Sequence, residues 1–170
     1  MPSVLIVSDS HGSTNELKTI QTRHHADYKI HCGDSELEMD DPELAGFIKV
    51  GGNCDMDVRY PEEQVSTVDD VTFFIAHGHL HQVKSNPLVI AYRAEEQGAQ
   101  VVCFGHTHIA GAEKTGNQLL INPGSVLLPR GRKDKTYAIM AWDTLDNVSV
   151  HFYTIDGYRL EDLSLKTSLS

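Results

Sequence analysis

Five short polar motifs occur in this sequence, and each directly follows a run of apolar residues. Short apolar runs such as residues 4–7 are typical of buried strands, so each motif is expected to lie at the carboxyl end of a strand. Ligands of open α/β sheets bind outside the carboxyl ends of the strands, and we therefore expect the motifs to meet along one edge. They are Asp9-Ser10-His11, Gly33-Asp34, Gly52-Asn53-Cys54-Asp55, His77-Gly78-His79 and Gly105-His106-Thr107-His108.

The residue types in these motifs favour a site for transition-metal ions. Carboxylate, imidazole and amide groups suit Mn, Fe, Zn, Ni or Co better than Ca or Mg. Asp9 and His11 are two residues apart and can bind one ion from an extended segment, and His106 and His108 have the same spacing. Asp34 is the natural candidate for a carboxylate that bridges two ions. Glycines at positions 33, 52, 78 and 105 are expected to keep side-chain bulk away from the ions.

The order of expected elements indicates one α/β domain over residues 1–170, with 156–170 packed loosely. Strands alternate with helices in the first half, whereas the second half contains hairpins, and this mixture predicts two packed sheets with helices outside. Ser13 and Glu16 are spaced as a capping box, and Asn86-Pro87 is a typical helix start. Strands are expected at 4–7, 28–32, 47–50, 65–68, 71–76, 100–104, 110–114, 118–122, 137–142 and 148–154, and helices at 13–25 and 86–98.

Charge and cysteine content limit the partners and the compartment. The formal net charge is −10, which argues against general nucleic-acid binding because such proteins neutralise phosphates with a basic face. No apolar run is long enough to cross a membrane, and the first residues resemble a strand more than a signal peptide. The three cysteines form no CxxC pair, which agrees with a reducing compartment. We expect a cytoplasmic protein with a small anionic substrate and leave homo-oligomerisation open.

The motifs in this order resemble the signature of calcineurin-like metallophosphoesterases: Asp-x-His, Gly-Asp, Gly-Asn-x-Asp and Gly-His-x-His. The resemblance runs from Val4 to about Thr154, which is nearly the whole chain. The small size, Cys54 and the segment 122–125 (Asn-Pro-Gly-Ser) are similar to the YfcE-type subgroup of small bacterial and archaeal phosphodiesterases. The resemblance implies a four-layer α/β/β/α sandwich of two packed mixed sheets.

The resemblance also implies two metal ions, often Mn, and a ligand set for each. The first ion is expected at Asp9, His11, Asp34 and His108, and the second at Asp34, Asn53, His77 and His106. A hydroxide that bridges the two ions is expected to attack phosphorus in line with the leaving oxygen. We therefore expect the chain to be a metal-dependent phosphoric ester hydrolase.

Cys54 is the main departure from the family pattern, because many relatives have His at this position. A thiol is a weak hydrogen-bond donor, so we expect activated diesters with aryl leaving groups to be preferred over monoesters. Asn53, Cys54 and His77 are the expected catalytic residues. His79, Cys54 and Ser125 are the expected substrate contacts, with His79 or His81 as alternative replacements for the missing imidazole.

Each motif also has an ordinary structural explanation when it stands alone. Asp9 can cap a helix, Asp34 and Asn53 are common in turns, and His77 can be a hydrogen-bonded core histidine. Asp55 is expected to orient its turn, and the basic residues between 130 and 135 to be solvated. The alternatives to a phosphodiesterase are a protein-interaction scaffold on the same fold, like the retromer subunit, a phosphomonoesterase, and a nuclease.

Overall fold

The first sheet is built around β1, whose apolar residues are buried on both faces. In the computed structural model, which describes residues 1–170, β2 and β3 continue the sheet in parallel on one side of β1. Three antiparallel strands complete it on the other side, in the order β11-β10-β9-β1-β2-β3. The strands are β1 (Ser3–Val7), β2 (Tyr28–His31), β3 (Phe47–Lys49), β9 (Thr136–Thr144), β10 (Asn147–Thr154) and β11 (Arg159–Thr167).

The second sheet has five strands in the order β4-β5-β6-β8-β7. Its central strands β5, β6 and β8 pair in parallel, and hairpins add β4 at one edge and β7 at the other. The expected hairpin turns around residues 69–70 and 115–117 are confirmed. The strands are β4 (Glu63–Val68), β5 (Val71–Ala76), β6 (Val101–Cys103), β7 (Gly111–Thr115) and β8 (Gln118–Asn122).

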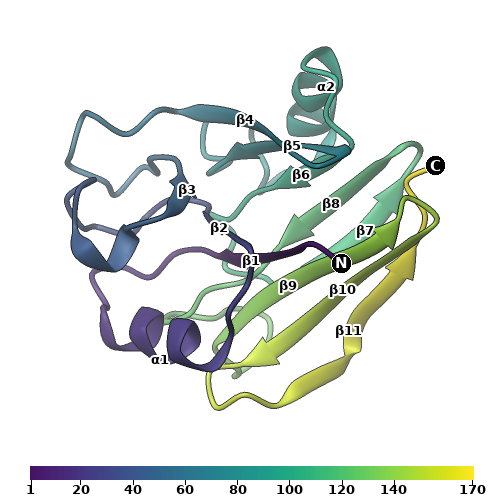
Figure 1. Cartoon of the computed structure of the whole chain (residues 1–170). Coiled ribbons are helices and arrows are strands. Elements are labelled where there is room, and N and C mark those ends of the chain that lie inside the picture. Colours follow the sequence, from purple (N-terminus) through teal and green to yellow (C-terminus); the bar gives the residue numbers. More distant parts are fainter.

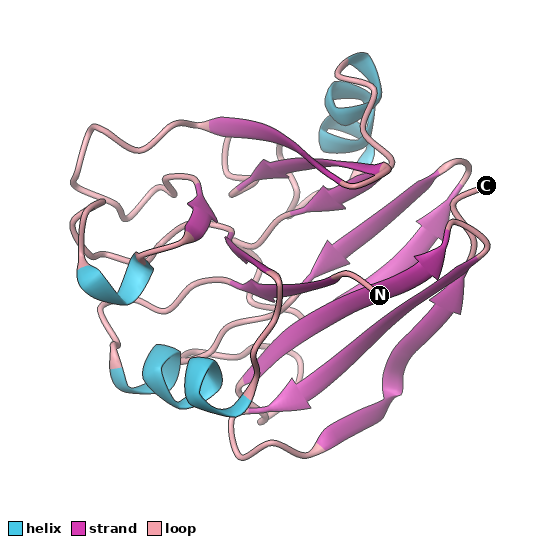
Figure 2. Cartoon of the chain, viewed as in Figure 1, coloured by secondary structure: helices cyan, strands magenta, loops and turns pink.

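Two helices cover the outer faces of the sheets, α1 (Asn15–Arg23) and α2 (Leu88–Glu96), and a short 3₁₀ helix, η1 (Pro42–Leu44), precedes β3. α1 packs Leu17 and Ile20 with residues of β1, while α2 packs against β5, β6 and β8. Figures 1 and 2 show the two helices on opposite sides of the pair of sheets. The expected four-layer α/β/β/α arrangement is confirmed. No helix in the structure has the length and apolar character that a membrane crossing requires.

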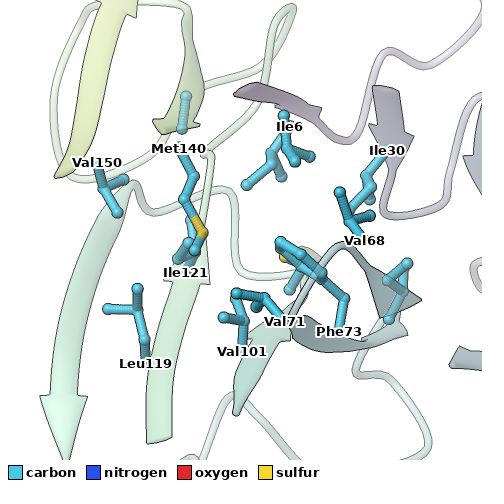
Figure 3. Packing of buried hydrophobic residues seen from close by; sticks show 14 of the residues in the cluster. Ile6, Ile30, Val68, Val71, Phe73, Val101, Leu119, Ile121, Met140 and Val150 are labelled. Carbon is cyan, nitrogen blue, oxygen red and sulfur yellow. The ribbon is translucent and has the colours of Figure 1, made fainter. Parts of the chain in front are cut away.

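The main core lies between the sheets and contains nineteen buried apolar residues. The alternation of strand side chains decides which residues belong to it: Ile6 faces the other sheet, whereas Leu5 faces α1. In Figure 3, Ile6 and Met140 from the first sheet lie opposite Phe73 and Ile121 from the second. Burial of this apolar surface holds the sheets together and fixes the loops at their ends.

The structure corrects two expectations about the helix starts. The first helix starts at Asn15, after Thr14, which makes no side-chain cap. The expected capping box does not form, because the Ser13 hydroxyl donates to the Glu16 carboxylate and not to a backbone amide. The second helix starts at Leu88, whose N–H donates to the Asn86 side chain at 2.9 Å. Residues 156–170 contain β11, which pairs with β10 along the first sheet, and none of these residues is fully buried.

Candidate metal centre

The loops that follow β1, β2, β5 and β6 bring six of the predicted ligands together in two groups. In each group the candidate ligand atoms all lie within 4.8 Å of one another. The groups adjoin, because Nε2 of His77 is 3.7 Å from Oδ1 of Asp9 and 3.1 Å from Oδ2 of Asp34. The first group contains Asp9, His11 and His108, and the second contains Asp34, His77 and His106.

Three histidines of the site each have Nδ1 hydrogen-bonded to an oxygen that can only accept. His11 contacts Oε1 of Glu36 at 2.7 Å, His77 contacts the Cys32 carbonyl at 2.8 Å, and His108 contacts the Leu128 carbonyl at 2.6 Å. Nδ1 therefore carries the proton in each ring, and the Nε2 lone pair is left for another partner. This arrangement is typical of metal-binding histidines, whose second nitrogen is held by a carboxylate or a carbonyl.

The free nitrogens crowd around one buried oxygen atom, Oδ1 of Asp9, that has no hydrogen-bond partner. Nε2 of His11 lies 3.3 Å from Nε2 of His108, which in turn is 3.2 Å from Oδ1 of Asp9. Asp9 Oδ1 and His77 Nε2 are both buried without a hydrogen bond. Unpaired buried polar atoms are costly, and lone pairs that face one another repel. Divalent cations would satisfy all of these atoms, so the residues present fit the expected metal site.

The charge distribution of the site also attracts cations. Burial opposes ionisation of Asp9, but the neighbouring imidazoles of His108 and His11 outweigh it and lower the pKa of Asp9 well below its usual range. In the opposite direction, the neighbouring Asp9 carboxylate raises the pKa of His11 to about 9 against the effect of burial. The field of the buried carboxylates therefore favours positive charge at this position.

Asp34 is held in position by the loop that contains the third motif. Its Oδ1 accepts the N–H of Cys54 at 2.8 Å. Asp55 accepts the N–H groups of Asp34 and Gly52 through Oδ2, at 2.8 and 2.7 Å, which confirms its expected role in orienting the turn. A Cβ on Gly52 would collide with the Asp34 carboxylate, so glycine is required there for the close approach.

Five of the ligand residues have left-handed backbone conformations, which are uncommon for residues other than glycine. Such conformations cost about 1–3 kcal/mol each and persist where the surrounding structure enforces them, often at functional sites. Here they allow side chains that are close in sequence to point toward a common centre. The φ angles are 55° at Asp9, 43° at His11, 58° at Asp34, 68° at His106 and 62° at His108.

Two expected catalytic residues, Asn53 and Cys54, lie at the exposed rim of the site. The Asn53 amide donates to Sγ of Cys54 at 3.6 Å and belongs to neither ligand group. Cys54 instead lies with His11 and Glu36. Burial and the charge of Asp34 raise the pKa of the Cys54 thiol to about 11, so it is protonated at neutral pH.

The residues expected near the substrate have different surroundings in the structure. His79 is half-buried, and its ring centroid lies 5.4 Å from that of His77 and 6.2 Å from that of His106. His81 is directed elsewhere, with Nε2 bonded to Glu63 at 2.8 Å. The expectation for Ser125 is wrong: the residue is fully buried, and its hydroxyl donates to the Asp9 carbonyl at 2.7 Å. Ser125 supports a ligand loop and has no surface for a substrate.

Sequence reasoning missed two supporting residues. Glu36, which was not among the expected site residues, accepts a hydrogen bond from Nδ1 of His11. Ser8 donates to Oδ2 of Asp9 at 2.6 Å, which leaves Oδ1 for a cation. The only signal for Glu36 was its position two residues after Asp34, and an acidic residue in a loop is too common to single out.

Comparisons with known proteins agree with this arrangement. The model of the calcineurin-like phosphoesterase superfamily domain matches residues 3–145. YsnB of Bacillus subtilis, a probable metallophosphoesterase, is 47% identical over 98% of this chain and 99% of its own. The crystal structure of a predicted phosphoesterase from Streptococcus pneumoniae superimposes with a TM-score of 0.93 at 33% identity, covering 98% of this chain and 97% of that one.

The expected subgroup is found among the relatives as well. The phosphodiesterase YfcE of Escherichia coli is 30% identical over 64% of this chain and 59% of its own length. The family match covers most of the chain, and the metal-ligand motifs that define the resemblance converge in the structure. This chain belongs to the calcineurin-like phosphoesterase superfamily.

Proposed function

We propose that this protein is a phosphodiesterase that holds two divalent cations, with Mn²⁺ the preferred candidate, and hydrolyses a small phosphodiester in the cytoplasm. The observation that carries the proposal is the set of imidazoles whose free Nε2 atoms surround two buried carboxylates. When bound, the cations would stabilise charge on the phosphoryl oxygens and lower the pKa of water. Asp9, His11 and His108 would hold one ion and Asp34, His77 and His106 the other, with Asp34 as the shared carboxylate.

In this proposal, the residues around the candidate ligands hold the ligand side chains in the orientation that metal binding requires. Glu36 and two backbone carbonyls hold the imidazoles in one tautomer, so the site needs little reorganisation to accept cations. The Asn53 side chain is exposed and bonded only to the Cys54 thiol, and we assign it to the second ion after a side-chain rotation. Fixed ligands and oriented charge supply most of the catalysis in phosphoryl transfer.

The chemistry of Cys54, the residue that we assign to the leaving-group side of the site, supports a preference for diesters. Cys54 is protonated at neutral pH but is a weak donor, so it gives little help to a basic leaving group. His79 lies next to His77 and His106, with its Nδ1 buried and unpartnered, and is the nearest imidazole for a substrate contact. We therefore assign activated aryl diesters as the best substrates and place His79 beside the ester.

A direct assay tests this function. The purified protein is stripped of metal with a chelator, reconstituted with Mn²⁺ and assayed on bis-p-nitrophenyl phosphate. We expect turnover that depends on added metal, and its loss in Asp34→Asn, which removes the shared charge but keeps an oxygen for the Cys54 N–H. Absence of metal-dependent turnover would favour the scaffold alternative, and full activity of Asp34→Asn would show that the site is misplaced.

A further inference from the structure

A groove of about 370 Å³ lies on the outer face of the second sheet, next to the loop that carries His106 and His108. Its size is within the range of pockets for small ligands. Half of its lining is hydrophobic, with Phe104 and Ile109 among the apolar walls, and Lys84 and Glu113 provide its charges. None of the candidate metal ligands lines this groove.

Gly111 at the start of β7 is one reason that the groove exists. Side chains alternate along a strand, and Ala112 packs into the core between the sheets, so positions 111 and 113 face the outer side. A Cβ built on Gly111 meets nothing within 4 Å, although Gly111 pairs with Asn122 on the neighbouring strand. The missing side chain leaves open space beside Ile109, a residue that is 53% exposed.

The groove adjoins the loop that carries His106 and His108, and the residue they share is Thr107. This residue lies between His106 and His108 and is itself a wall of the groove. Asn122 holds Thr107 by donating to its hydroxyl at 2.9 Å, so the shared wall is fixed. Val83, another wall of the groove, donates its N–H to the carbonyl of Gly78, which lies between His77 and His79 in the chain.

We propose that this groove binds the organic group of the phosphate ester, and that the group is an aromatic or heteroaromatic ring; this inference rests on the proposed function. An ester whose phosphorus is held by the two ligand groups must project its organic group away from them, and this groove lies beside the loop that carries His106 and His108. The groove has one cation, Lys84, so its lining favours an uncharged ring over a polyanion. Apolar walls with few polar groups are typical of ligand sites that bind by burial of a ring.

Binding of two phosphonates to the zinc-loaded protein tests the proposal without catalysis. Phenylphosphonate and methylphosphonate share the anionic group and differ in the ring. We expect phenylphosphonate to bind about tenfold more tightly, as burial of part of an aromatic ring implies. It should also shift the backbone amide NMR signals of residues 109–113 and 120, whereas methylphosphonate should leave them in place.

Variants of the groove separate ring binding from general damage. Gly111→Phe fills the open space and should remove the preference for phenylphosphonate while binding of methylphosphonate persists. Ile109→Ala, an exposed change that does not threaten folding, should weaken the preference. Thr115→Phe adds the same ring to the same edge strand outside the groove and should keep it.

The proposal is overturned if wild type binds the two phosphonates equally or binds neither, or if Gly111→Phe and Thr115→Phe behave alike. Its failure is distinguishable from failure of the proposed function. Ring-selective binding without metal-dependent hydrolysis would contradict only the proposed enzymatic function. Metal-dependent hydrolysis without ring selectivity would contradict only the proposal that the groove binds the ring.

Discussion

Glu36→Ala is the substitution that most directly tests how the site prepares its imidazoles. Oε1 of Glu36 lies 2.7 Å from Nδ1 of His11 and fixes the tautomer that presents Nε2 to Asp9. Loss of such an outer partner typically weakens metal binding 10–100-fold. The Glu36 side chain is 42% exposed, so water can replace part of the interaction. We therefore expect the low end, about tenfold or ~1.4 kcal/mol.

Calorimetric titration of the metal-free protein with Mn²⁺ measures this change. Glu36→Gln is the matched control, because its amide oxygen can still accept the Nδ1 proton while the negative charge is lost. We expect Glu36→Gln to retain most of the affinity that Glu36→Ala loses. Equal affinity of Glu36→Ala and wild type would refute the reasoning. Equal losses in both variants would show that charge at position 36 matters and tautomer control does not.

Three further predictions follow from the site. Gly105→Ala should destabilise the protein by about 1–3 kcal/mol in urea unfolding, because the added Cβ meets the side chains of Ser8 and Asp9; unchanged stability would contradict that packing. Cys54→His should raise activity on p-nitrophenyl phosphate relative to the bis-p-nitrophenyl diester, and an unchanged ratio would remove our explanation of the preference. The pKa of His11 is raised from 6.5 to about 9, so its contribution to metal-free stability is complete below pH 6.5 and disappears as the pH rises through 9. Thermal unfolding across this range should show the loss, and His11→Gln should flatten it.

The sequence was sufficient to predict most of the metal centre because its ligands follow apolar strands in a fixed order. Asp9, Asp34 and His77 could be placed at one edge from strand ends alone, and the structure brings them together. Ser125 could not be assigned in this way. Its role depends on a hydrogen bond to Asp9, 116 residues away in the chain, and no local pattern reports such a contact.

β11 was missed because a bulge disturbs its pattern. The pairing with β10 shifts register between Val150 and Phe152, so Leu160 and Leu163 are three residues apart although both pack against the core. Strict alternation is the usual signal of a half-buried strand, and the three extra residues of β11 at this shift break it. The prediction of a capping box was wrong for a different reason. Ser13 and Glu16 have the right spacing, but the Ser13 hydroxyl donates to the Glu16 carboxylate and not to a backbone N–H.

Anomalous diffraction from a crystal soaked in Mn²⁺ tests the central claim most directly. We expect two peaks about 3.5–4 Å apart, the separation usual for two-metal phosphoesterase sites. One should lie among Asp9, His11 and His108, and the other beside His77 and His106. A single peak, or peaks that the Nε2 atoms of these imidazoles do not contact, would contradict the account.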